Sequence, residues 1–162
     1  MHNSTLDDIK NQLKLNPKLI LLIVLKGRHH FLTDLKDLNL KNSDKSQCVS
    51  VLLMNSYFMP KIGLDVQHRF HYVIWFDGGE FWNGETSAKL DKLFFPDIDF
   101  MIGRFVKICP GKRIRLISME ESLVRFVSML REKYAIEGPK SVDTECFTSK
   151  IQMKTVARTQ GS

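Results

Sequence analysis

The spacing of apolar residues predicts a helix and then a buried strand at the start of the chain. Between Ser4 and Leu15, apolar residues recur every three or four positions, as in an amphipathic helix. Pro17 ends that pattern, and an unbroken apolar run follows from Leu19 to Leu25. A run without polar positions is typical of a strand that is buried on both faces. The apolar spacing predicts one more short helix over residues 31–40.

The middle of the chain carries the patterns of a strand and a hairpin. Apolar and β-branched residues predict a strand from Val49 to Phe58. From His71 to Asn83, aromatic and β-branched residues flank a Gly-rich turn, which is the composition of a β-hairpin. A three-residue loop with Gly79 left-handed would place His71 and Asn83 on one face of the hairpin. A two-residue loop would move Asn83 to the other face, because side chains alternate along a strand.

Two further strand-like segments carry the densest group of basic residues. Phe100–Ile108 and Lys112–Ile117 lie on either side of a Pro-Gly turn, which predicts a second pair of strands. Five cations and no acid occur in this interval: Arg104, Lys107, Lys112, Arg113 and Arg115. Basic surfaces bind nucleic acid by displacing counterions from its phosphates, so these residues predict an RNA-binding surface. The alternative is a solvated pair of strands.

The last part of the chain predicts two helices. Ser118 and Glu121 have the spacing of a capping box, with the serine accepting from the amide of Glu121, and the helix that they open would run to about Tyr134. Residues 143 and 144 are candidate caps of a final helix that starts beside Cys146. A thiol at a helix N-terminus is more easily ionised.

Composition limits the class of protein. The chain has 162 residues, 43% hydrophobic and 26% charged, which suits one globular domain and excludes a fully disordered chain. The apolar run Leu19–Leu25 is far shorter than the roughly 20 residues that span a bilayer, so no membrane span is expected. Asp7 and Asp8 and the lack of a cleavage site argue against a secretory signal, so an intracellular location is expected.

Cofactors and metals are not expected from the sequence. The three cysteines lack CxxC spacing, which argues against a zinc site and a disulfide framework. His68 and His71 are three residues apart, and on a strand such positions face opposite sides. The net charge of +6 makes an acidic partner plausible without naming one.

Three residues have the chemistry of a thiol triad. The imidazole of His71 would take the proton of the Cys146 thiol, and Asn83 would orient the imidazole ring. Each residue also has a structural interpretation, because strand histidines are often surface residues and a cysteine in an apolar helix is often part of the core. Cys48 precedes His71 in ordinary papain order, yet it stands at a predicted strand, whereas a papain-type cysteine opens a helix.

The segment from His71 to Asn83 resembles the H-box of the permuted NlpC-like papain fold. Lecithin:retinol acyltransferase and the H-Ras-like suppressor acyltransferases have a similar histidine strand, a Gly-rich turn and a second polar residue twelve positions on, the spacing of His71 and Asn83. Within this group, the chain is most similar in scale to the H-box/NC type 2A proteins of parechoviruses and kobuviruses. The similarity covers about residues 49–157.

The resemblance implies a fold and a division of the chain. The expected class is α+β, with an antiparallel sheet packed with helices on a permuted NlpC/papain-like scaffold. Residues 1–46 would form an N-terminal helix-strand-helix extension, 47–158 the H-box/NC-like domain and 159–162 a loose tail.

The resemblance also implies a function. It predicts a viral nonstructural accessory protein in the host cytoplasm, near replication membranes, that acts by binding RNA or host proteins. Glu145 stands where the family has asparagine before the cysteine, and a neighbouring carboxylate disfavours a thiolate. A non-enzymatic role is therefore the prediction, with an acyltransferase or phospholipase forming a thioester on Cys146 as the alternative.

Overall fold

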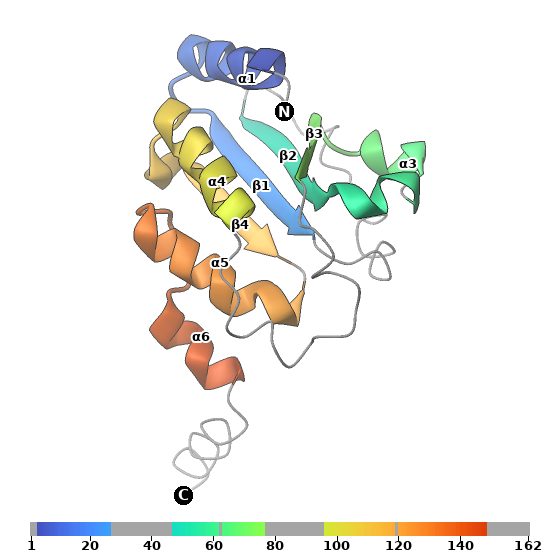
Figure 1. Ribbon diagram of the computed structural model, residues 1–162. Helices are drawn as coiled ribbons and strands as arrows, with labels where there is room; N and C mark the ends of the chain where they lie inside the picture. Colours follow the sequence, from blue (N-terminus) through green and yellow to red (C-terminus); the bar gives the residue numbers. More distant parts are fainter. Residues whose placement is uncertain (1–2, 27–46, 62, 77–95, 119, 149–162) are drawn as a thin grey trace, which may run out of the picture.

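A parallel sheet with helices around it forms the protein (Figure 1). The computed structural model describes residues 3–26, 47–61, 63–76, 96–118 and 120–148. The strands are β1 (Ile20–Lys26), β2 (Cys48–Asn55), β3 (Tyr72–Phe76) and β4 (Ile114–Ser118). The helices are α1 (Asn3–Leu15), α3 (Leu64–Gln67), α4 (Pro96–Ile108), α5 (Glu121–Lys133) and α6 (Ser141–Thr148), with 3-10 turns η2 (Ser56–Lys61) and η5 (Gly111–Arg113).

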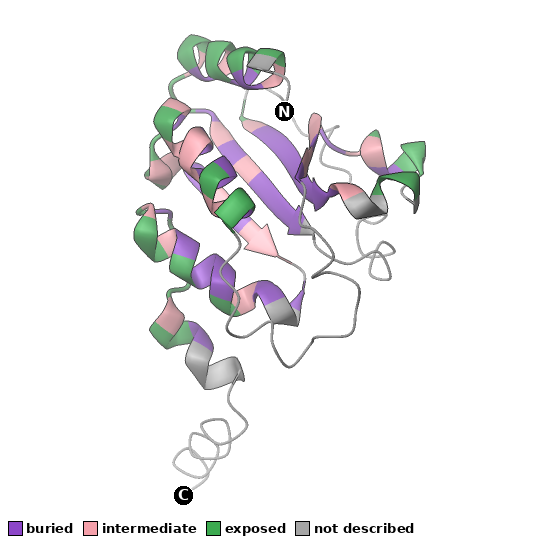
Figure 2. Ribbon diagram, in the orientation of Figure 1, coloured by how far each residue is buried: buried purple, intermediate pink, exposed green. Residues whose placement is uncertain are grey.

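The four described strands run parallel in the order β3-β2-β1-β4. Ile23 of β1 is paired with Val51 of β2 on one side and with Leu116 of β4 on the other. The apolar run predicted as a buried strand is confirmed, since Ile23 and its neighbours Val24 and Leu25 are fully buried. Figure 2 shows that most of β1 and β2 is buried, so the core is built on the centre of this sheet.

The mixed helix and strand composition is confirmed, but the sheet differs from the antiparallel sheet expected from the sequence. All three strand pairs among the described residues are parallel. The strand that begins after His71 is paired with β2, and residues 77–95, which include the predicted second arm of the hairpin, lie outside the described residues. The physical reason is burial: parallel strands are covered on both faces and have continuous apolar sequences, as β1 and β2 do.

The segment Phe100–Ile108 was predicted as a strand, and this prediction is wrong. It belongs to helix α4, which begins at Pro96 with two acids in its first turn. Pro is favoured at the first position of a helix, and acids there interact favourably with the helix dipole. The buried positions Ile98, Ile102 and Phe105 are spaced as on one face of a helix. This spacing outweighs the aromatic and β-branched composition, which favours a strand.

The N-terminal segment contributes to the same sheet. Helix α1 buries Leu6, Ile9 and Leu13 as predicted. Strand β1 lies between β2 and β4, so residues 20–26 pass through the middle of the core instead of forming an added outer layer. The predicted helix over 31–40 lies outside the described residues, and the division of the chain at residue 46 stays a prediction.

The two C-terminal helices begin at positions other than those predicted. Helix α5 starts at Glu121, and the Ser118 hydroxyl accepts from the amide of Glu120 at 3.2 Å, one residue earlier than a capping box requires. Helix α6 starts at Ser141, so Cys146 is its sixth residue and lies beyond the first turn. The stabilisation of a thiolate by a helix N-terminus is therefore not available at Cys146, because that effect is confined to the first turn. None of the described helices is long and apolar enough to cross a membrane.

Candidate functional site

His71 is bound to the neighbouring strand through Ser50. The Ser50 amide donates to His71 Nδ1 at 3.0 Å, and the Ser50 hydroxyl lies 2.8 Å from the same nitrogen. The His71 amide donates back to the Ser50 hydroxyl at 3.1 Å. Since a backbone N–H is always a donor, Nδ1 is the acceptor and the proton of the neutral ring is on Nε2. Ser50 is fully buried, so this pair joins β2 to the start of β3 and does not offer a nucleophile to a substrate.

The other members of the predicted triad lie elsewhere or outside the described residues. Asn83 lies outside them. Cys146 is in α6, which packs on α5, and α5 in turn packs on β4. His71 precedes β3, and β3 and β4 are the two edges of the described sheet. The backbone arrangement thus places α6 at the far edge of the sheet from His71 (Figure 1).

The two other cysteines are not activated thiols. Cys48 is half-buried and opens β2, as expected for a strand residue. Burial raises the pKa of the Cys48 thiol, although a hydrogen bond with the Leu22 backbone opposes this. Burial also raises the pKa of Cys109, against the opposing effect of the Arg113 charge. A raised pKa keeps a thiol protonated, and the thiolate is the reactive form.

The strand order places a topological switch point at the carboxyl edge of the sheet. β1 leads along the chain to β2 and then β3 on one side, whereas β4 lies against the other side of β1. The chain therefore reverses its direction of progress across the sheet at the boundary between β1 and β4. In open parallel sheets, ligands bind outside the carboxyl ends of the strands at such a reversal.

Three described polar residues mark this carboxyl edge. Asn55 ends β2 and is fully buried. Ser118 ends β4, and Glu120 precedes α5 with 2% of its surface exposed. These residues place an amide, a hydroxyl and a carboxylate at the ends of the strands. Sequence reasoning missed all three, although a polar residue directly after an apolar strand was a usable signal for Asn55.

The five predicted RNA-binding residues do not form one strand pair. Arg104 and Lys107 lie on α4, Lys112 and Arg113 lie on η5, and Arg115 lies on β4. Arg115 forms an ion pair with Glu137 at 2.5 Å and also donates to the carbonyls of Lys112 and Ile114. Its charge is thus paired with a carboxylate of the same chain at the surface.

Arg113 joins η5 to the turn between α1 and β1. Its guanidinium donates to the Pro17 carbonyl at 2.5 Å and lies 3.5 Å from the Asn16 carbonyl. This contact holds the turn that follows α1, with Lys14 and Lys18 on either side of it, against η5, which carries Lys112. Sequence reasoning did not include Lys14 and Lys18. We call Lys14, Lys18, Lys107, Lys112 and Arg113 the basic face.

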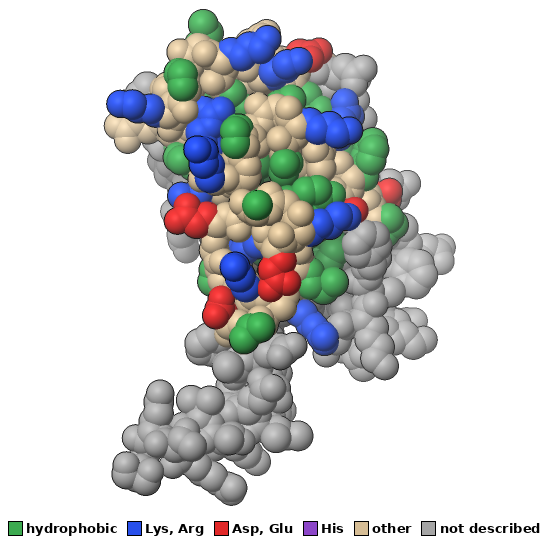
Figure 3. Space-filling view, turned by 90° about the vertical axis from the view of Figure 1, so that its left-hand side faces the viewer, with side chains coloured by type: hydrophobic (Ala, Val, Ile, Leu, Met, Phe, Trp, Pro, Cys, Tyr) green, Lys and Arg blue, Asp and Glu red, His purple; other side chains and the backbone are tan. Residues whose placement is uncertain are grey.

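The basic face is open to a large partner. All of its lysines are exposed, and Figure 3 shows Lys and Arg side chains gathered on this side of the molecule. Between described residues, ion pairs join Arg115 to Glu137 and Lys133 to Asp99, and no residue of the basic face takes part in them. The four lysines are therefore exposed and, among the described residues, are not held in ion pairs.

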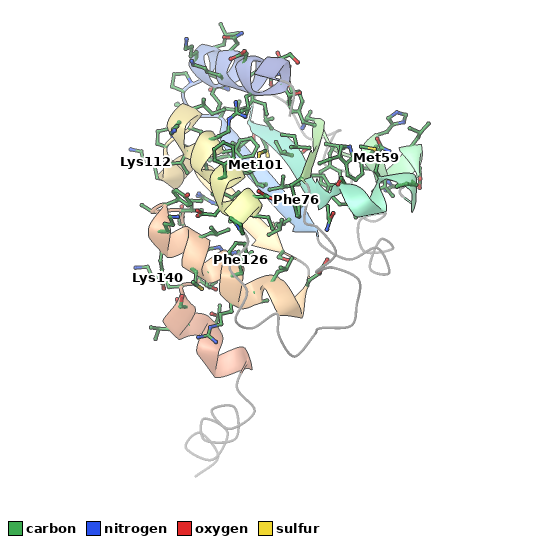
Figure 4. The ribbon with its side chains drawn as sticks, viewed as in Figure 1. Met59, Phe76, Met101, Lys112, Phe126 and Lys140 are labelled. Carbon is green, nitrogen blue, oxygen red and sulfur yellow. The ribbon has the colours of Figure 1, made fainter. Side chains whose placement is uncertain are left out.

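A shallow groove of about 460 Å³ lies below the basic face. Lys112 and Lys140 stand on its rim and point away from the core (Figure 4). Arg131 lines it, donating to the Leu116 carbonyl at 2.6 Å and to the Pro139 carbonyl at 3.1 Å. Burial lowers the pKa of Arg131. Through these hydrogen bonds Arg131, a residue of α5, joins that helix to β4 and to the turn before α6.

No cluster of three metal-ligating side chains occurs within the part of the chain that the structure describes. Comparison with known proteins gives no assignment: no family model matches the sequence, and no curated protein matches it.

Proposed function

We propose that the protein is an α/β ligand-binding domain that holds a small polar molecule at the carboxyl edge of its sheet, between β1 and β4. The observation that carries this proposal is the strand order β3-β2-β1-β4 with all strands parallel. That order places a reversal of chain direction between the central strand β1 and the edge strand β4, and ligands of open α/β sheets bind at such reversals.

The polar residues at this edge indicate the chemistry of the ligand. Glu120 brings a buried carboxylate to the start of α5, and a carboxylate accepts hydrogen bonds from hydroxyl or amino groups. Ser118 can accept or donate beside it, and Asn55 adds an amide at the end of β2. A molecule rich in hydroxyl or amino groups, such as a nucleoside or nucleotide, has the complementary groups.

The test is a titration of the labelled protein with ATP, adenosine and NAD, followed by amide NMR shifts. The expected result is that one of these compounds shifts the amides of Asn55, Ser118 and Glu120 most. We expect Ser118→Ala to weaken the binding of that compound about three- to tenfold, which corresponds to the loss of about one hydrogen bond. The control Ser4→Ala removes an exposed hydroxyl from α1 and should bind as the wild type does. Shifts confined to Ser50 and Ile114, at the opposite half of the strands, or no shifts at all, would overturn the proposal.

A second function is supported by the basic face. We propose that this surface binds RNA through its phosphates, the role implied by the resemblance to viral 2A proteins. The supporting observation is that Lys107 and Lys112 are exposed and lie outside the ion pairs of the described residues, and that Arg113 joins η5 to the turn between Lys14 and Lys18. A viral origin, host-protein partners and a cytoplasmic location near replication membranes stay predictions.

RNA binding by this surface should depend steeply on salt. Lys107→Gln and Lys112→Gln should each weaken binding and reduce the slope of log affinity against log salt by roughly one unit or less. Arg125→Gln removes one exposed charge from α5 and is the matched control, for which the slope should stay that of the wild type. Equal slopes for all four proteins in a fluorescence anisotropy series would count against the basic face.

Acyl transfer on Cys146, as predicted with His71 as the base, requires the imidazole to lie within hydrogen-bond reach of the thiol. Here α6 and the start of β3 lie at opposite edges of the described sheet. The described arrangement gives this alternative no support, and the two binding functions above are the ones proposed.

A further inference from the structure

The outer face of α4 combines an exposed aromatic ring with cations. Phe100 has 65% of its surface exposed, whereas Phe105 on the same helix is fully buried. Most large apolar residues of α4 point to the core, so an exposed phenylalanine is not explained by packing. Such a ring offers an aromatic surface on which a planar partner can stack.

Phe100, Arg104 and Lys107 lie on one stripe of the helix surface. They are spaced at i, i+4 and i+7, and residues with this spacing share a face. With a rise of about 1.5 Å per residue, the stripe from Phe100 to Lys107 is roughly 10 Å long. Lys112 of the basic face follows α4 after a short turn, so the stripe leads from the ring towards the basic face.

Two acids lie near this stripe, and one of them is paired with residues outside α4. Asp99 accepts from Lys133 Nζ at 2.7 Å and lies 3.0 Å from the Tyr134 hydroxyl, so its charge is directed to α5. Asp97 is exposed in the first turn, on the side of Phe100 away from the cations. A bound strand would therefore extend from Phe100 towards Lys107 and Lys112, away from Asp97.

We propose that this stripe binds single-stranded RNA, with one base stacked on Phe100 and the adjoining phosphates at Arg104 and Lys107. The inference rests on the proposed RNA binding by the basic face and adds the form of RNA that is bound. Stacking on aromatic side chains needs a base that is not paired or stacked inside a duplex. An RNA duplex can contact this surface only through its phosphates, because its bases are paired and stacked. Phe100 would therefore contribute nothing to duplex binding.

The experiment compares an oligouridine strand with an RNA duplex of equal length, by fluorescence anisotropy at several salt concentrations. Phe100→Ala should weaken single-strand binding by about 5- to 150-fold, the range typical of the loss of one stacked base, and duplex binding by less than about twofold. Phe100→Trp should restore single-strand affinity. The salt slope of Phe100→Ala should equal that of the wild type, because no charge is removed.

Controls separate the inference from the function on which it rests. Leu15→Ala removes another exposed apolar side chain, 86% exposed on α1, and should not change either affinity. If the wild type shows no salt-dependent binding to either RNA, the RNA function itself fails. If it binds both RNAs and Phe100→Ala binds the single strand as the wild type does, only the stacking role of Phe100 is overturned.

Discussion

Replacing Phe105 with alanine is expected to lower the free energy of unfolding by about 3–5 kcal/mol. The Phe105 ring is fully buried on the inner face of α4. Its removal loses the transfer free energy of the ring and leaves a cavity that close packing cannot refill completely. Ile102→Ala is expected to cost about 2–5 kcal/mol for the same reason, since Ile102 is also fully buried.

This pair of substitutions tests whether the segment is a helix or a strand. Residues 102 and 105 are three apart, so they share a face in a helix and lie on opposite faces in a strand. Phe100→Ala is the matched control and should change stability by less than about 0.5 kcal/mol, because Phe100 is mostly exposed. Urea unfolding followed by circular dichroism measures all three. A large loss for Phe105→Ala together with a negligible loss for Ile102→Ala would favour the strand.

Local sequence patterns were sufficient to predict the elements whose buried residues form one regular pattern within a single segment. The apolar run at 19–25 identified β1, and the apolar stripe of α1 identified that helix, because each pattern is complete within one segment. Helix α4 was missed because its inward residues begin at Ile98, before the segment that was interpreted as a strand. A window that started at Pro96 would have included the helix start signals as well.

The arrangement of the strands could not be obtained from local patterns. β1 is paired with β4, although about 90 residues separate them in the chain, and no periodicity within either strand records that pairing. The switch point at the carboxyl edge follows from this pairing, so local patterns could not identify Glu120 and Asn55 as candidates for one site. The basic face shows the same limit: Lys14 and Lys18 join it only through the contact of Arg113 with Pro17.

Tyr72 fastens α1 to the edge strand β3. Its hydroxyl donates to the Asp8 carboxylate and accepts from Gln12 Nε2 at 2.6 Å. Asp8 and Gln12 are one turn apart on α1, so both can reach the same hydroxyl. Burial, followed by the hydrogen bond and the charge of Asp8, raises the pKa of Tyr72 to about 12.

Tyr72→Phe is expected to lower the free energy of unfolding by about 1–2 kcal/mol near neutral pH, a value that allows for the exposure of Asp8 to solvent. The folded-state pKa lies above the ordinary value of 10, so the stabilising contribution is complete below about pH 10 and is lost as the pH rises towards 12. The difference between wild type and Tyr72→Phe should therefore shrink over this range. The pKa of Tyr134 is also raised, mainly by burial and Asp99, but this residue is present in both proteins and its effect cancels. Urea unfolding at about pH 8 and about pH 11 measures the difference, and one that stays constant or grows at high pH would contradict the assignment.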